Sequence, residues 1–153
     1  MISIVDLLSP ECIQLNLAQK RKKRVIFELA AVLEAAHKVR DGKALARKIV
    51  ERESVSSTGI GHGVAIPHSL TELADQTVMA FGRSISGVPF DSVDKKPVQL
   101  IFLLTGPLSA GGEHLKLLSR LSRLLTEQSF REGLLSAGSA EEIIDLFRKG
   151  EGL

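Results

Sequence analysis

The heptapeptide VQLIFLL at residues 98–104 is apolar at six of its seven positions. A strand with one solvated face alternates apolar and polar residues, whereas an interior strand that is covered on both faces is apolar throughout. A second β-prone run occupies residues 78–83, and Gly87, Pro89 and Asp94 between the two runs favour a loop or hairpin. The sequence therefore predicts a central sheet in which residues 98–104 form an interior strand.

Two amphipathic helices are expected before these strands. Residues 24–39 carry apolar side chains at helical spacing, with charged residues between them. Asp41 has the side chain of an N-cap, and the apolar positions within residues 43–53 indicate a second helix directly after it. We expect these two segments to form a helical pair.

Helices are also expected after the strands. Regularly spaced leucines within residues 113–125 predict a strongly amphipathic helix, and Ser139 with Glu142 indicates a capping box at the start of a last helix. The order helices, strands, helices is typical of an α/β layered fold. No repeat, low-complexity segment or composition break divides the chain, so we expect residues 1–153 to form one domain.

The composition excludes several classes of protein. Hydrophobic residues make up 44% and charged residues 25% of the 153 residues, as in ordinary globular proteins. A net charge of +2 and the absence of Trp and Tyr argue against nucleic-acid binding. No apolar run is long enough to insert directly into a membrane, and the N-terminus lacks the pattern of a signal peptide. Because Cys12 is the single cysteine, a reducing compartment is expected, and we place the chain in the cytoplasm.

The most unusual stretch is STGIGHGVAIPH at residues 57–68. Glycines at every second position, Gly63 among them, leave main-chain N–H groups free to approach an anion or a partner's active site. Pro67 fixes the backbone that leads into His68. A largely neutral imidazole offers one nitrogen lone pair at pH 7 without a separate base, so His68 could accept a phosphoryl group directly.

A phosphohistidine would need cations, hydroxyls or amides around its added negative charge. Arg52, Ser57, Thr58 and His114 are the available candidates. His114 lies in line with the leucine stripe of its helix, so it is either a core residue or, at the first turn of that helix, a residue that lines an anion-binding cleft.

Other interpretations of the glycine-rich stretch stay open. It could be a pair of strand edges with a glycine turn and a histidine of no function. The P-loop pattern is absent, and GIGHG lacks the full spacing of a dinucleotide-binding motif. A zinc site that uses His62 and His68 would lack a convincing third or fourth ligand. The basic run at residues 20–24 is either a solvated face or a docking patch for an acidic partner.

Arg52 and Glu53, followed by residues 57–68, resemble the signature of the type-2 IIA family of the phosphotransferase system (PTS). In that family an arginine–glutamate pair precedes a segment STGIGxGxAIPH that ends in the phosphorylated histidine. The segments GVPFDSVDKKPVQLIFLLTGP at residues 87–107 and HLKLLSRLSRLL at residues 114–125 also resemble the family, in the same order. The resemblance therefore covers essentially the full chain.

This resemblance implies both a fold and a site. The implied fold is a mixed, roughly five-stranded sheet flanked by helices. The implied site has His68 as phosphoryl acceptor, His114 as a second histidine that supports it by hydrogen bonding, and Arg52 as the cation. The resemblance implies no cofactor and no metal, and it implies an HPr/NPr-type phosphocarrier protein as the donor.

Several functions are compatible with these observations. The leading one is a phosphocarrier in PTS phosphorelay and regulation, most like a free-standing nitrogen-regulatory IIA protein. One alternative is a free-standing fructose- or mannitol-type sugar IIA protein that passes phosphate to a cysteine of a IIB component. Another is a phosphorylation-switched regulator that binds target proteins without obligatory onward transfer. The weakest is a metal-dependent hydrolase that uses His62, His68 and His114.

Overall fold

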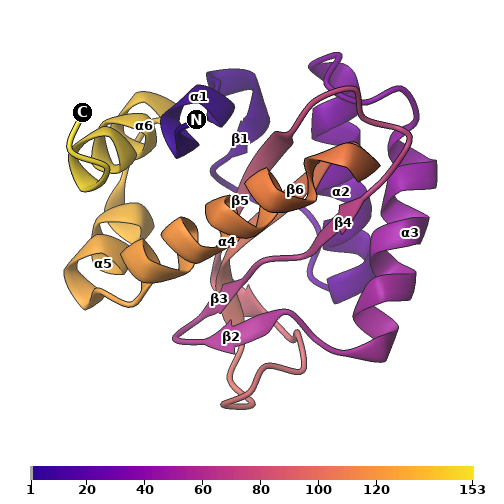
Figure 1. The fold of residues 1–153 in the computed structure, drawn as a ribbon. Helices are drawn as coiled ribbons and strands as arrows, with labels where there is room; N and C mark the ends of the chain where they lie inside the picture. The colour runs from indigo at the N-terminus through magenta and orange to yellow at the C-terminus, as the bar shows by residue number, and fades with distance from the viewer. Residues whose placement is uncertain (1) are drawn as a thin grey trace.

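The computed structural model describes residues 2–153, which form helices around one mixed sheet (Figure 1). The strands are β1 (Ile13–Gln14), β2 (Gly59–Gly61), β3 (Val64–Ala65), β4 (His68–Leu70), β5 (Val78–Val88) and β6 (Val98–Gly106). The helices are α1 (Ile4–Leu7), α2 (Lys22–Ala35), α3 (Gly42–Val55), α4 (Gly111–Leu125), α5 (Gln128–Ser136) and α6 (Ala140–Gly150), with 3₁₀ turns at Pro10–Cys12 and Leu108–Ala110.

Strand β6 is the centre of the sheet. It runs antiparallel to β5 on one edge and parallel to β3 and then β4 on the other, and the strand order is β1-β5-β6-β3-β2 with β4 also on β6. The predicted α/β fold with a mixed sheet flanked by helices is confirmed. The sheet has six strands because β3 and β4 share one edge of β6 in succession.

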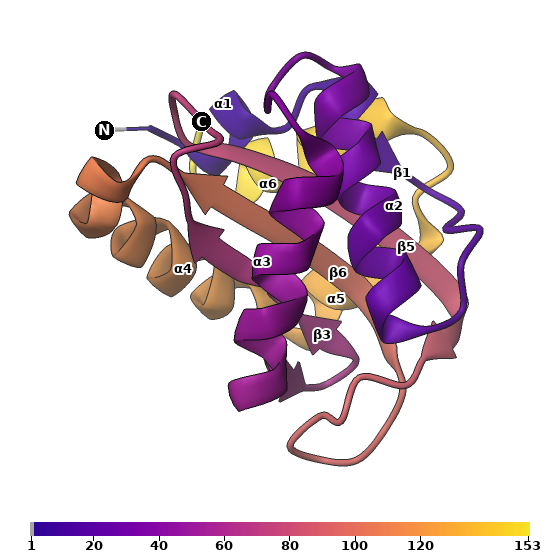
Figure 2. The ribbon, with the colours of Figure 1, turned by 90° about the vertical axis from the view of Figure 1, so that its right-hand side faces the viewer.

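Both faces of the sheet are covered, as the apolar run at residues 98–104 predicted. Ile101 and Leu103 pack in the core beneath α2 and α3, whereas Phe102 and Leu104 pack in the core beneath α4, α5 and α6. Figures 1 and 2 show α2 and α3 on one side of the sheet and α4 to α6, with α1, on the other. Alternate side chains of β6 therefore pack into two separate hydrophobic cores, one on each face of the sheet.

The helix starts follow the capping residues of the sequence. The Asp41 side chain accepts the Ala44 N–H at 3.0 Å, so α3 begins directly after the predicted N-cap. Ser139 accepts the Glu142 N–H at 3.2 Å, but the Glu142 carboxylate accepts the Gly138 N–H at 2.7 Å. The predicted capping box is therefore only half formed, because the reciprocal bond goes to the residue before the N-cap.

Helix α5 was not predicted, and a buried arginine on β5 supports its end. The Arg83 guanidinium donates to the carbonyl oxygens of Leu134, Leu135 and Ala137 at 2.6–3.3 Å and to that of Leu15 at 3.0 Å. These acceptors include the last carbonyls of α5, where a cation is favoured by the helix dipole. Arg83 thus joins β5 to the C-terminal layer of helices.

Within residues 2–153, no helix combines the length and the apolar character that crossing a bilayer requires.

Replacing Arg83 by Met should lower the free energy of unfolding by about 3 kcal/mol, because several buried carbonyl oxygens lose a charged donor. Urea unfolding monitored by circular dichroism measures this change. Arg47→Met, at an exposed position of α3, is the matched control and should change the same quantity by less than ~0.5 kcal/mol. Equal effects of the two substitutions would contradict the role of Arg83.

Candidate functional site

His68 is the first residue of β4, a strand that pairs with β6. In Figure 1, β4 lies between α3 and α4. It is in register with Leu104 of β6, which is in register with Met79 of β5. Leu104 and Met79 both face the core beneath α4, so His68 shares that face of the sheet. The strand pairing therefore turns the imidazole toward α4.

The backbone on both sides of His68 is held by hydrogen bonds. The Pro67 carbonyl accepts the Leu104 N–H at 3.0 Å, and the Ser69 carbonyl accepts the Thr105 hydroxyl at 2.8 Å. Pro67 itself restricts the preceding residue to extended geometry. The position of His68 is thus set by β6 and by the proline that the sequence places before it.

The His68 ring has one nitrogen engaged and one free for chemistry. Nδ1 lies 2.6 Å from the carbonyl oxygen of Ile66. A carbonyl oxygen can only accept a hydrogen bond, so Nδ1 carries the proton and Nε2 carries the lone pair in the neutral ring. His68 is half-buried, which leaves part of the ring open to a partner.

His114 lies against His68. It is the fourth residue of α4, and the centroids of the two rings are 5.4 Å apart with their planes inclined by 51°. His114 is buried, and its Nδ1 atom has no hydrogen-bond partner among residues 2–153. His114 thus faces inward, as a core residue does, and also lies beside His68.

Burial, with a smaller contribution from the positive charge on His68, lowers the pKa of His114 from its ordinary value of 6.5 to about 4. His114 is therefore neutral at pH 7 and holds a single ring proton. Because a buried N–H without an acceptor is more costly than an unmet lone pair, the proton is favoured on Nε2 rather than on the enclosed Nδ1.

Arg52 lies on the last turn of α3, beside the strand that holds His68. Its guanidinium is exposed and donates to the Ser56 carbonyl at 3.0 Å. One turn earlier Lys48 pairs with Glu72 beyond β4 at 3.1 Å, and α3 packs against β4. Arg52 therefore lies near the start of β4, and its guanidinium is held by a hydrogen bond at the end of its own helix.

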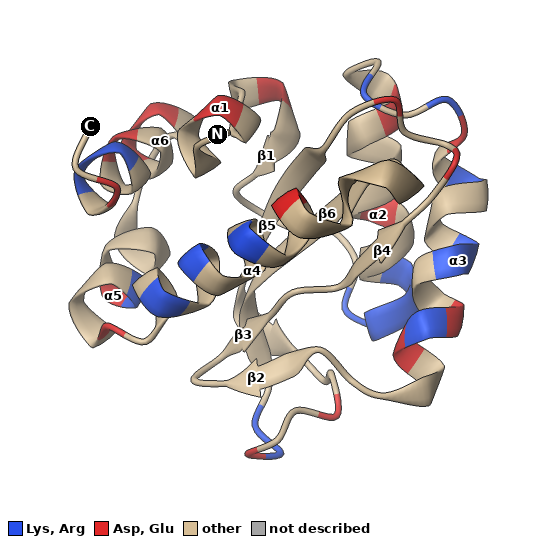
Figure 3. Cartoon of the chain, viewed as in Figure 1, with Lys and Arg blue, Asp and Glu red and all other residues tan. Residues whose placement is uncertain are grey.

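The charges around β4 are arranged unevenly. Figure 3 shows basic residues on α3, on α4 and at the start of α2, whereas β2, β3 and β4 carry no charged residue. Helix α4 contains Lys116, Arg120 and Arg123 and one acidic residue, Glu113. His68 thus lies in an uncharged strand between two predominantly basic helices, and the first turn of α4 offers N–H groups at its positive end.

The remaining candidates differ in their distance from His68. Ser57 donates its hydroxyl to the Phe90 carbonyl at 2.5 Å, and the buried Thr58 donates its hydroxyl to Glu53, so neither hydroxyl is free. Gly63 accepts the N–H groups of Gln99 and Leu100 at 2.8 and 2.9 Å. This register places Gly63 roughly 16 Å along β6 from the level of His68. The structure does not bring Gly63 to His68.

His62 is also remote from the histidine pair. It lies exposed in the turn between β2 and β3 with a φ of 57°, and its N–H donates to Asp94 at 3.2 Å. Among residues 2–153, no three His, Cys, Asp or Glu side chains are grouped so as to hold a metal ion. The geometry therefore gives no support to a metal centre built from His62, His68 and His114.

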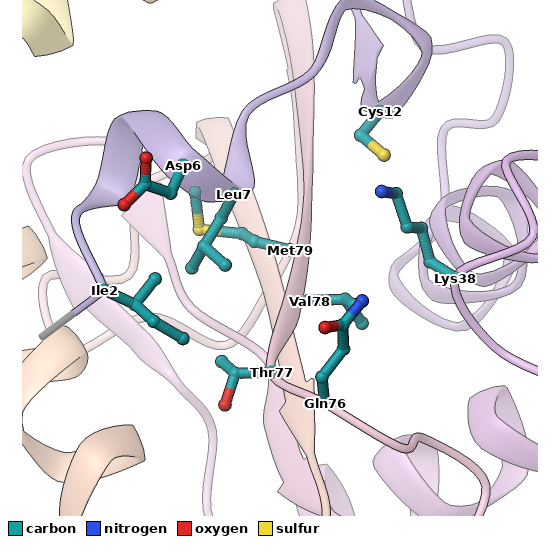
Figure 4. Close-up of a pocket in the computed structure, with 9 residues that line it drawn as sticks. All are labelled: Ile2, Asp6, Leu7, Cys12, Lys38, Gln76, Thr77, Val78 and Met79. Carbon is teal, nitrogen blue, oxygen red and sulfur yellow. The ribbon is translucent and has the colours of Figure 1, made fainter.

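A small pocket of about 190 Å³ lies elsewhere, between α1 and the start of β5 (Figure 4). Cys12 and Lys38 line it together with Asp6, and neither His68 nor His114 does. The histidine pair therefore lies outside this pocket.

Comparison with known proteins identifies this arrangement. Residues 6–150 match the family model described as phosphoenolpyruvate-dependent sugar phosphotransferase system, EIIA 2. The chain belongs to this family. Its members are phosphotransfer components, and the chain is a PTS IIA-type phosphocarrier.

Individual relatives of this IIA protein come from two branches. It is 43% identical over 148 residues to the fructose-specific EIIABC component of Bacillus subtilis, covering 97% of this chain but only 23% of that much longer protein. It is 37% identical to a nitrogen regulatory protein of Bradyrhizobium diazoefficiens, covering 92% of this chain and 91% of that protein. The crystal structure of nitrogen regulatory protein IIA-Ntr from Neisseria meningitidis superposes with a TM-score of 0.88 at 38% identity, covering 94% and 98% of the two chains.

The lowered pKa of His114 predicts a pH-dependent contribution to stability. Between pH 6.5 and about 4 the unfolded chain binds a proton at this imidazole and the folded chain does not. The contribution is therefore fully present above pH 6.5 and is lost as the pH falls toward 4. Urea unfolding across this interval should show a steeper loss for the wild-type IIA protein than for His114→Gln, and parallel pH profiles would contradict the prediction.

Proposed function

We propose that Nε2 of His68 accepts a phosphoryl group from the phosphohistidine of an HPr/NPr-type carrier and later passes it on. The observation that carries this proposal is the 2.6 Å contact between His68 Nδ1 and the Ile66 carbonyl, which leaves the lone pair on Nε2. A tautomer fixed in this way presents a nucleophile without a preceding proton transfer.

The transfer balances without a cofactor. The Nε2 lone pair forms the new N–P bond while the N–P bond of the donor phosphohistidine breaks, and the donor imidazole keeps the bonding electrons. His68 then carries a partial positive charge on its ring, and its Nδ1 proton stays bonded to the Ile66 carbonyl. The step requires in-line positioning and stabilisation of the moving oxygens rather than a metal.

The groups around His68 would stabilise the charge on the phosphoryl oxygens. The neutral His114 can donate its Nε2 proton to a phosphoryl oxygen on the adjacent ring, 5.4 Å away between centroids. Arg52 would supply the cation from the end of α3, and the first turn of α4 would add its N–H dipoles. Ser57 and Thr58 would act through the backbone, because their hydroxyls are engaged.

We further propose that the protein acts in PTS phosphorelay and regulation, as a nitrogen-regulatory IIA. The likeness to IIA-Ntr from Neisseria meningitidis over nearly the full length of both chains supports this branch. The likeness to a fructose-specific component supports the alternative, in which His68 passes phosphate to a IIB cysteine. Rapid transfer to a purified sugar-specific IIB component would favour the sugar branch. Its absence, with binding to a target that depends on phosphorylation, would favour regulation.

The reaction is tested by intact-mass measurement after incubation with phosphoenolpyruvate, enzyme I and an HPr/NPr-type carrier. Wild type should gain one acid-labile phosphoryl group, and His68→Ala should gain none because the nucleophile is removed. His62→Asn is the matched control, since it alters an exposed histidine in a turn whose positive φ Asn tolerates, and it should be phosphorylated like wild type. No addition with carriers of either branch would overturn the proposal.

Replacing Arg52 by Gln should slow phosphorylation of His68 by about 10²-fold, because one cation near the developing charge is lost. Arg52→Lys should retain part of the rate, since it keeps the charge but not the planar donor geometry. Rapid-quench measurements give the rates, with the exposed Arg47→Gln on the same helix as control. Equal rates for Arg52→Gln and Arg47→Gln would exclude Arg52 from the site.

A further inference from the structure

The proposed reaction does not use a buried carboxylate on α3. Glu53, in the last turns of α3, has a side chain with only 2% of its surface exposed. It accepts the Thr58 N–H at 3.1 Å, the Thr58 hydroxyl, and an ammonium hydrogen of Lys22 at 2.8 Å. A buried carboxylate is tolerated only when paired and hydrogen-bonded in this way, so its position is closely defined.

Lys22 reaches this carboxylate from the start of α2. Its side chain is 18% exposed, and its ammonium group lies 4.8 Å from the centroid of the Phe90 ring. The other members of the basic run, residues 20, 21, 23 and 24, are exposed. Lys22 therefore differs from its neighbours, because it points into the protein and neutralises Glu53.

From Glu53 a series of hydrogen bonds leads to the acceptor ring. Glu53 holds both the N–H and the hydroxyl of Thr58. The Thr58 carbonyl accepts the Ile66 N–H at 3.2 Å, and the Ile66 carbonyl accepts the His68 Nδ1–H at 2.6 Å. Hydrogen bonds arranged in series polarise one another, and each fixes the orientation of the next group.

These hydrogen bonds fix the chain at the point where it is not paired with β6, between β3 and β4. Strand β3 ends at Ala65 and β4 begins at His68, so Ile66 lies between the two pairings with β6. Pro67 has no N–H group to contribute. The Ile66 N–H donates to the Thr58 carbonyl instead of to β6. The carbonyl that selects the tautomer of His68 therefore depends on the position of Thr58.

We propose that Glu53, neutralised by Lys22, is a positioning residue for His68: it fixes Thr58 and, through the Ile66 carbonyl, the Nδ1–H tautomer whose Nε2 atom is the nucleophile. This inference rests on the proposed phosphoryl transfer, and it assigns to the buried pair a function beyond stability. It also divides the basic run, since Lys22 serves the site while its neighbours face solvent.

The inference is tested by measuring the tautomer of the His68 imidazole by NMR. In protein labelled with ¹⁵N at its histidines, the imidazole nitrogen shifts of His68 report how the proton divides between Nδ1 and Nε2 at a pH where the ring is neutral. Glu53→Gln and Thr58→Val should lower the Nδ1–H population and slow phosphorylation of His68 at least tenfold. Thr58→Ser, which keeps both donors to Glu53, should retain the wild-type tautomer. Glu51→Gln, at an exposed position of the same helix, is the matched control.

The outcomes separate the inference from the proposed function. Unchanged tautomer populations in folded Glu53→Gln and Thr58→Val would overturn the inference, even if both variants lost stability or transferred slowly. If Glu53→Gln does not fold, the His68 tautomer populations of Thr58→Val and Thr58→Ser are compared instead, and equal populations in these two variants would overturn the inference. A shifted tautomer in a protein whose wild type accepts no phosphoryl group would uphold the positioning by Glu53 while refuting the phosphocarrier role of His68.

Discussion

The parallel pairing of β4 with the last residues of β6 is the constraint on which the site depends. β6 is long enough to pair with β3 near its start and with β4 near its end, and the residues between those two strands include Pro67. The break lets the chain leave the ladder for two residues and return with His68 facing α4. A carbonyl in that break, freed from the sheet, becomes the acceptor for the His68 ring. The sheet thus supplies both the location and the protonation pattern of the imidazole.

The second constraint is the start of α4, which meets β4 across the sheet edge. His114 lies one turn into this helix, where burial keeps it uncharged, and the helix presents its positive end nearby. Two cationic imidazoles at a centroid separation of 5.4 Å would repel each other, so the neutral state of His114 favours the positive charge that His68 would carry in the proposed phosphoryl transfer. The histidines therefore act as an unequal pair, with one open to a partner and one enclosed.

Sequence reasoning reached the parts of the fold that local patterns specify. The apolar run at residues 98–104 revealed a strand with two covered faces, and helical spacing located α2, α3, α4 and α6. Strand β4 was not predicted, because its three residues, HSL, are too few to show a strand pattern. They pair with residues of β6 that are distant in the sequence. Helix α5 was not predicted, because Leu134 is the one residue of that helix that is fully buried. Its C-terminal end is also held by Arg83, which lies about fifty residues earlier in the sequence. The motif of residues 57–68 predicts a role for His68, but no local pattern shows that Gly63 lies far along β6.

Glu53 shows why charged residues are the hardest to interpret from sequence. On an amphipathic helix a glutamate is expected at the surface, and only the tertiary arrangement reveals that Lys22 meets it from another helix. Lysine at the start of a helix is disfavoured by the helix dipole, and a buried carboxylate is disfavoured by the loss of water. Each residue compensates the unfavourable position of the other, while Thr58 donates a hydrogen bond to each of the two carboxylate oxygens. Pairs that solve only a packing problem are commonly replaceable by apolar residues of similar volume, but an apolar pair could not hold the main chain of Thr58. The Lys22–Glu53 ion pair therefore connects α2 and α3 to the backbone that orients His68.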